Sequence, residues 1–87
     1  MSTEFKGLTA VVTGAGSGIG LSVARMLSES GAKVFGLDLN QGDMDSSATF
    51  ISCDVSDPAK VAAAFSEISK ATDVIDVLAN NAGVGAI

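Results

Sequence analysis

The stretch Leu8–Leu27 reads LTAVVTGAGSGIGLSVARML, and it decides the fold of the chain. Its first part, Leu8–Val12, is a short apolar run that stops at glycines, as buried strands commonly do. From residue 19 onward the apolar residues recur with the spacing of one helix face, whose members are Ile19, Val23, Met26 and Leu27. The sequence therefore predicts a strand, a glycine-rich turn and a helix in direct succession.

The turn between this strand and this helix contains Gly14, Gly16, Gly18 and Gly20. A strand that passes through glycines into a helix start presents free backbone N–H groups and the positive end of the helix dipole, which suit a phosphate. Because glycine has no Cβ atom, a diphosphate can approach the backbone closely. A plain strand–helix connection without a ligand is the alternative interpretation of the turn alone.

The spacing of these glycines narrows the class of site. The common dinucleotide pattern G-x-G-x-x-G does not fit, because its third glycine would fall on Ile19 or Leu21. The pattern that fits is Thr-Gly-x-x-x-Gly-Ile-Gly over residues 13–20. No Gly-Lys-Ser/Thr follows, which argues against a P-loop and a nucleotide triphosphatase.

Length and composition bound the remaining possibilities. The 87 residues allow one domain at most, and 47% of them are hydrophobic without a run as long as a membrane span. A single cysteine, Cys53, and the absence of His argue against a disulfide framework and a zinc site. The net charge of −5 argues against a nucleic-acid partner. With no signal-peptide or membrane pattern, we expect a cytoplasmic protein.

The order of apolar segments predicts an α/β fold. We expect strands at Leu8–Val12, Lys33–Asp38, Ala48–Cys53 and Val74–Ala79, and helices from about Gly18 to Ser30 and from Pro58 to about Lys70. Residues 39–47 are polar without helical spacing, which predicts a loop with at most one helical turn. Right-handed crossovers then give a partial Rossmann-type parallel sheet with flanking helices and strand order 3-2-1-4. Gly36, inside the second strand, suggests close packing there by the first helix.

Four segments in this order resemble the short-chain dehydrogenase/reductase family. The glycine-rich segment of residues 13–20 resembles its cofactor motif, and the further matches are Asp38, Cys53-Asp54-Val55 and Asn80-Asn81-Ala82-Gly83. The resemblance covers essentially the whole chain. It implies that residues 1–87 are the N-terminal portion of a single NAD(P)-binding Rossmann domain. The parent would transfer a hydride between nicotinamide and an alcohol or carbonyl substrate.

Asp38 carries the prediction of cofactor choice. It lies 20 residues after Gly18 at the end of a predicted strand, where a carboxylate can accept hydrogen bonds from ribose hydroxyls. The same charge would repel a 2′-phosphate, and the positions that could carry a phosphate-binding cation are Ser17 and Leu39. NAD is therefore favoured over NADP. The alternative is that Asp38 only ends a strand and caps the next turn.

The resemblance assigns adenine contacts to Asp54 and Val55, the first through its carboxylate and the second through its backbone N–H. An aspartate in a turn before the second helix is the competing interpretation of Asp54. Ser17 would turn its hydroxyl toward the glycine turn, toward a ribose phosphate or toward solvent. The predicted cofactor-binding set is Gly14, Ser17, Gly18, Ile19, Asp38, Leu39, Asp54, Val55, Asn81, Ala82 and Gly83.

The end of the fourth predicted strand has two roles. Asn81, Ala82 and Gly83 would line the nicotinamide-side ribose, and Asn80 would lie within the sheet. Cys53 is expected to be a small buried apolar side chain, since no His is present to activate it as a nucleophile. Asp73 and Asp76 are expected to be solvated charges before the strand.

Catalytic and metal-binding residues are absent from the prediction. The family's proton transfer uses a Tyr supported by a Lys, with a Ser and an Asn, and this sequence contains no Tyr. We therefore expect cofactor binding without catalysis from these residues alone. The alternatives are a non-catalytic dinucleotide-binding module and a segment that folds only with a partner. An exposed fourth strand would favour a homo-oligomer or a missing C-terminal segment.

Overall fold

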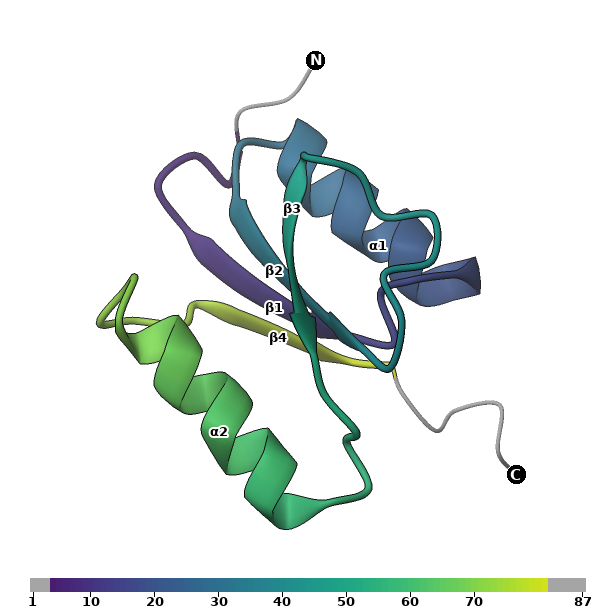
Figure 1. Cartoon of the computed structure of the whole chain (residues 1–87). Coiled ribbons are helices and arrows are strands. Elements are labelled where there is room, and N and C mark those ends of the chain that lie inside the picture. Colours follow the sequence, from purple (N-terminus) through teal and green to yellow (C-terminus); the bar gives the residue numbers. More distant parts are fainter. Residues whose placement is uncertain (1–3, 82–87) are drawn as a thin grey trace.

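The computed structural model describes residues 4–81, which form one parallel four-stranded sheet and two helices. Along the chain the elements are β1 (Thr9–Thr13), α1 (Gly18–Glu29), β2 (Lys33–Asp38), β3 (Ala48–Ser52), α2 (Pro58–Ser69) and β4 (Val77–Asn80). The strand order is β3-β2-β1-β4, which confirms the predicted topology. In Figure 1, α1 lies on one face of the sheet and α2 on the other.

Two apolar clusters fill the spaces between the sheet and the helices. Every residue of β1 is buried, because this strand lies between β2 and β4 and is covered on both faces. Successive side chains alternate between the faces. Ala10 and Val12 pack in the cluster beneath α1, whereas Val11 packs with Phe35 and Ile68 in the cluster beneath α2.

The buried face of α1 differs from the prediction. It consists of Gly20, Leu21, Ala24 and Leu27. Of the residues predicted for that face, Leu27 is buried, but Ile19 is 69% and Met26 55% exposed. The reason is close packing. Gly20 and Ala24 are small, so the helix backbone can approach the sheet, and a pattern read from apolar size alone selects the bulkier neighbouring stripe.

The fourth strand begins later than predicted, at Val77 rather than Val74. Asp76 occupies the end of the ladder: its Oδ2 accepts a hydrogen bond from the Thr9 N–H at 2.8 Å, and its own N–H donates to the Thr9 carbonyl at 2.9 Å. The side chain takes the donor that strand pairing would otherwise use, so Val74 and Ile75 lie outside the ladder. Asp76 is therefore a structural partner of β1 and not only a solvated charge.

The strand β2 has the predicted bounds at both ends, and the other remaining boundaries agree with the prediction or differ from it by one residue. β1 runs one residue further than predicted, because Thr13 pairs with both Leu37 and Asn80. The helices α1 and α2 and the strand β3 each end one residue earlier than predicted.

The crossover segment, which we define as residues 39–47, contains no helix, in agreement with the prediction. It nevertheless contributes a buried side chain, Met44, to the cluster beneath α1. A Cβ atom on Gly36 would overlap the Met44 sulfur and lie 3.0 Å from the Ala15 Cβ. Met44 and Ala15, not the first helix, therefore explain the glycine in β2. Within residues 4–81, no helix has the length and apolarity that a membrane crossing requires.

Candidate functional site

The carboxyl ends of the parallel strands lie at one edge of the sheet (Figure 1). A partly open pocket of about 130 Å³ lies at this edge. This strand-end pocket is lined by Gly14, Leu37, Asp38, Leu39, Cys53, Asp54 and Val55. Five members of the predicted cofactor-binding set are therefore brought together by the fold. Sites that enclose a whole drug-sized ligand have about 300–1,000 Å³. The strand-end pocket is thus large enough for one ring or sugar of a larger ligand.

Asp38 joins the end of β2 to the glycine-rich turn. Its Oδ2 accepts a hydrogen bond from the Gly16 N–H at 2.9 Å, and its Oδ1 accepts one from the Leu39 N–H at 2.7 Å. The carboxylate is half-buried and held by two backbone donors. Each carboxylate oxygen has a second lone pair, so the group could also accept hydrogen bonds from a ligand's hydroxyls. The contact with Gly16 was not foreseen from sequence.

Glycines set the path of the backbone at the start of α1. Gly14 and Gly18 have φ values of +65° and +58°, in the left-handed region that favours glycine. A Cβ atom on Gly20 would overlap the Gly14 carbonyl, so the helix can begin here only with glycine at this position. Ser17, the N-cap residue, is exposed and its side chain makes no capping hydrogen bond. The side chain of Ser17 therefore leaves the first N–H groups of α1 to other acceptors.

Asp54 and Cys53 also line the strand-end pocket. Asp54 Oδ1 accepts hydrogen bonds from the Ser56 hydroxyl at 2.6 Å and the Ser56 N–H at 3.0 Å, and these bonds lower the pKa of the carboxyl group. Asp54 therefore stabilises a turn before the second helix, which is the alternative interpretation given for it above. Its carboxylate is also exposed beside the pocket. Cys53 is buried as predicted, and burial raises the pKa of its thiol.

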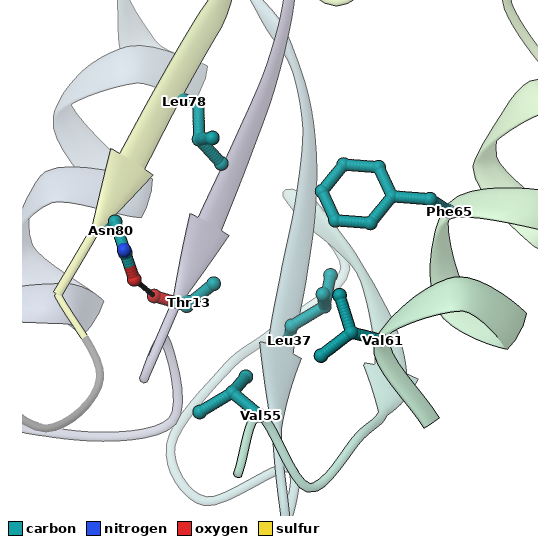
Figure 2. A pocket seen from close by; sticks show the side chains of 7 residues that line it. All are labelled: Thr13, Leu37, Val55, Val61, Phe65, Leu78 and Asn80. Atoms are coloured by element: carbon teal, nitrogen blue, oxygen red, sulfur yellow. Dashed lines mark hydrogen bonds between the residues drawn. The ribbon is translucent and has the colours of Figure 1, made fainter. Parts of the chain in front are cut away.

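The last described residues of the chain tie β4 to β1. Thr13 Oγ1 donates to Asn80 Oδ1 at 3.1 Å (Figure 2) and accepts from the Asn81 N–H at 2.9 Å. Asn80 thus lies in the sheet, as predicted. The side-chain nitrogen of Asn81, Nδ2, lies beside the start of α1, 2.8 Å from the position that a Cβ atom on Gly20 would take. The predicted residues Ala82 and Gly83 lie outside the described residues. Thr13, whose hydroxyl organises this junction, was not singled out from sequence.

A second hollow, of about 210 Å³, lies between α2 and the sheet. We call it the α2-side pocket; Figure 2 shows its lining, Thr13, Leu37, Val55, Val61, Phe65, Leu78 and Asn80. The lining is mainly apolar, and Leu78 on β4 is 57% exposed. No group of three or more His, Cys, Asp or Glu side chains within residues 4–81 is placed to hold a metal ion.

Sequence relationships agree with this geometry. The family profile described as short chain dehydrogenase matches residues 8–87, which include the glycine-rich turn and all four strands. The chain belongs to the short-chain dehydrogenase family. The resemblance drawn from four short motifs is confirmed.

Individual members of the short-chain dehydrogenase family are 33–38% identical to this chain in sequence. A mitochondrial borneol dehydrogenase of Lavandula x intermedia is 38% identical over 87 residues, covering 93% of this chain and 33% of that protein. A D-threitol dehydrogenase of Mycolicibacterium smegmatis is also 38% identical and covers 90% of this chain and 34% of that protein. The solved structure of ligand-free Thermoplasma acidophilum aldohexose dehydrogenase superimposes with a TM-score of 0.86 at 33% identity, covering 97% of this chain and 32% of that one.

The chain spans about a third of the length of these short-chain dehydrogenase relatives. The matched residues 8–87 of this chain include the glycine-rich turn, Asp38 and the Asn80–Asn81 junction.

Proposed function

We propose that this chain is the cofactor-binding part of an oxidoreductase that transfers a hydride between a nicotinamide dinucleotide and an alcohol or carbonyl substrate. Residues 1–87 would then be the N-terminal portion of a single Rossmann domain. Family membership supports a nicotinamide cofactor, and the gathering of five predicted binding residues in the strand-end pocket supports its location.

A dinucleotide fits the donor set of this edge. The N–H groups at the start of α1 would hold the diphosphate, and the Asp38 carboxylate would accept hydrogen bonds from the adenosine ribose. Leu39 and Val55 would flank the adenine, with the Asp54 carboxylate at its edge. The Asn81 junction with Ala82 and Gly83 would lie toward the nicotinamide ribose. When bound, the cofactor supplies the hydride acceptor or donor; these residues bind and orient it.

The single observation that carries the choice of NAD is the charge of the strand-end pocket. Its only charged lining residues, within the part of the chain that is described, are Asp38 and Asp54. Lys33 lies at the opposite end of β2, and Arg25 donates to the Asp43 carbonyl at 3.3 Å. A 2′-phosphate would therefore meet carboxylates without a compensating cation in the pocket wall. We propose NAD, not NADP, on this ground.

The test is titration of the whole protein with NAD and NADP, before and after the substitution Asp38→Arg. We expect the parent to bind NAD at least tenfold more tightly than NADP, and Asp38→Arg to reverse that preference. Asp45→Arg, which makes the same charge change on an exposed carboxylate of the crossover segment, should leave it unchanged. Equal NAD affinity of the parent and Asp38→Arg would reduce Asp38 to a structural residue.

These 87 residues are proposed to be inactive alone, because they hold no Tyr or His for proton transfer to or from a substrate oxygen. The exposed Leu78 and the apolar α2-side pocket favour a chain completed by a further segment or a second copy over a free-standing binding module. A cytoplasmic location and a small-molecule substrate remain part of this proposal. Measurable turnover by purified residues 1–87 would contradict it.

A further inference from the structure

The crossover segment lies directly on the glycine-rich turn. The Asp43 N–H donates to the Gly16 carbonyl at 2.9 Å, while the Gly16 N–H donates to Asp38 at 2.9 Å. Both polar backbone atoms of Gly16 are therefore held by residues at or after the end of β2. The direction of the turn depends on where the crossover segment lies.

The two backbones meet without side chains between them. A Cβ atom on Gly42 would overlap the Gly16 carbonyl, and Gly42 has a φ of +57°. A Cβ atom on Gly16 would lie 2.8 Å from the Asn40 carbonyl oxygen. Contact this close tolerates little displacement, so a shift of the segment would move the turn with it.

The buried side chain of Met44 holds the crossover segment against the sheet. Its side chain is 6% exposed and packs with Ala15 and Val34 in the cluster beneath α1. The sulfur lies over Gly36, in the space that a side chain on β2 would otherwise fill. The Met44 N–H donates to the Gln41 carbonyl at 3.1 Å, and the Gln41 side chain donates to the Met44 carbonyl at 3.2 Å. The anchor is thus rigidly linked to the residues that touch Gly16.

Hydrogen bonds from α1 hold the outer side of the same segment. Arg25 donates to the Asp43 carbonyl at 3.3 Å, and the Ser28 hydroxyl donates to the Ser47 carbonyl at 3.0 Å. Both contacts are exposed, so they are expected to contribute less than the buried methionine. Met44 is therefore the main apolar contact that keeps the segment in place.

We infer that Met44 is a positioning residue for the adenosine half of the dinucleotide, an inference that rests on the proposed function. Seated over Gly36, it holds the crossover segment against Gly16 and so fixes the glycine-rich turn and the Asp38 carboxylate before the ligand arrives. A binding group that is already in its bound geometry loses less conformational freedom on binding. Met44 itself touches no ligand in this scheme; it acts through Asp43, Gly16 and Asp38.

The test measures the affinity of the whole protein for ADP and for NAD by calorimetric titration. Met44→Ala should weaken the binding of both by about tenfold, because the turn and Asp38 are no longer held. Met44→Leu, of similar volume, should stay within about twofold of the parent. Met26→Ala, the same substitution on the exposed side of α1, serves as the matched control and should change neither affinity.

A second variant isolates the contact between Met44 and β2. Gly36→Ala places a methyl group where the Met44 sulfur lies, so we expect it to weaken ADP binding on its own. In the Met44→Ala background the clash with the sulfur is removed and only the contact with the Ala15 Cβ, at 3.0 Å, remains, so the further loss should be clearly smaller than in the parent. Non-additive losses of ADP affinity would show that the two substitutions act on one contact between Met44 and β2, whereas additive losses would indicate two independent effects.

Hydrogen exchange separates positioning from general destabilisation. Met44→Ala should accelerate exchange of the Asp43 N–H while leaving the amides of β1 protected. Ile68→Ala, a cavity in the cluster on the other face of the sheet, should lower the free energy of unfolding without changing ADP affinity. If Met44→Ala does not fold, Gly36→Ala and Met44→Leu carry the same test.

The outcomes are distinct. A parent that binds neither ADP nor NAD overturns the proposed function and this inference together. A parent that binds both, with Met44→Ala and Gly36→Ala within twofold of it, overturns the inference alone. Equal losses in Met44→Ala and Ile68→Ala reduce Met44 to a core residue and also overturn it. A tenfold loss confined to the Met44 and Gly36 variants, with rescue by leucine, supports it.

Discussion

The two helices begin at the same edge of the sheet, yet their first turns are completed in opposite ways. Both have twelve residues, and neither carries an acidic residue in its first turn. At α2, the Asp57 carboxylate accepts a hydrogen bond from the Ala59 N–H at 3.0 Å, and Pro58 at the first position has no N–H. At α1, Ser17 makes no side-chain capping bond.

The difference predicts that local capping decides which helix start can accept an anion. Both helices direct a positive dipole end toward the strand ends. At α2, a fixed carboxylate satisfies one donor and its charge repels anions. At α1, no carboxylate occupies the N-cap, and glycines bring the backbone within reach of a ligand. We therefore expect a diphosphate to bind at the start of α1 and not at that of α2. Four substitutions test this contrast.

The largest effect is expected at the third residue of α1. Gly20→Ala forces a Cβ atom into the Gly14 carbonyl, which should displace the turn. We expect a loss of NAD affinity of about a hundredfold and a fall in the free energy of unfolding of about 1–3 kcal/mol. Calorimetric titration and thermal unfolding measure the two. Lys60→Ala, at the third residue of α2, is the control and should alter neither; normal NAD binding by Gly20→Ala would refute the close-approach role.

A smaller loss should follow from giving α1 the cap that α2 has. Ser17→Asp places a carboxylate where it can accept the first N–H groups, in competition with the diphosphate. NAD affinity should fall about tenfold, while the free energy of unfolding rises by about 0.5 kcal/mol. Ser22→Asp, on the exposed side of the same helix, controls for the added charge. Tighter NAD binding by Ser17→Asp would place the diphosphate elsewhere.

The reverse change at α2 should affect stability alone. Asp57→Ala removes the capping acceptor and should lower the free energy of unfolding by about 1 kcal/mol. NAD affinity should stay the same, since this helix start is not part of the strand-end pocket. Chemical denaturation and titration of the whole protein measure both, with the exposed Asp73→Ala as control. A change in NAD affinity without a change in stability would reverse the assigned roles.

The smallest effect concerns the charge at the start of α2. Burial raises the pKa of the Cys53 thiol, and the carboxylates of Asp54 and Asp57 raise it further. Asp57→Asn keeps a capping oxygen but removes a charge, so the pKa should fall slightly and more thiolate should form at pH 8. Alkylation of Cys53 should then be slightly faster, with Asp73→Asn as control. A slower rate in Asp57→Asn would contradict this direction.

The topology could be predicted from sequence because it depends on local signals. The period of the apolar residues, the glycine-rich turn and Asp57-Pro58 mark where elements start, and handedness fixes the strand order. The missing helix in residues 39–47 was also visible, from length and polarity. These features require no knowledge of which side chains meet.

The errors arose where distant residues meet. The buried face of α1 is set by the small residues Gly20 and Ala24 against the sheet, not by the larger Ile19 and Met26. The start of β4 is set by Asp76, which bonds to β1 from 67 positions along the chain. The packing of Met44 over Gly36 of β2 leaves no local pattern in the sequence from which it could be predicted.

The site could be predicted in part. Gly14, Asp38, Leu39, Asp54 and Val55 do line one pocket, because parallel strands bring their carboxyl ends to one edge. Their contacts were not visible in sequence. Asp38 bonds to the Gly16 amide, and Asp54 is turned onto Ser56. Their roles toward a cofactor remain predictions.

The most direct test of the contrast between the two helix starts is an NMR titration of the ¹⁵N-labelled whole protein with ADP. Binding of the diphosphate at α1 predicts that the largest amide shifts fall within Gly14–Gly20, with the amides of Ala59 and Lys60 unmoved. Shifts centred on the start of α2, or none in Gly14–Gly20 at saturating ADP, would contradict the assignment of the glycine-rich turn as the anion site.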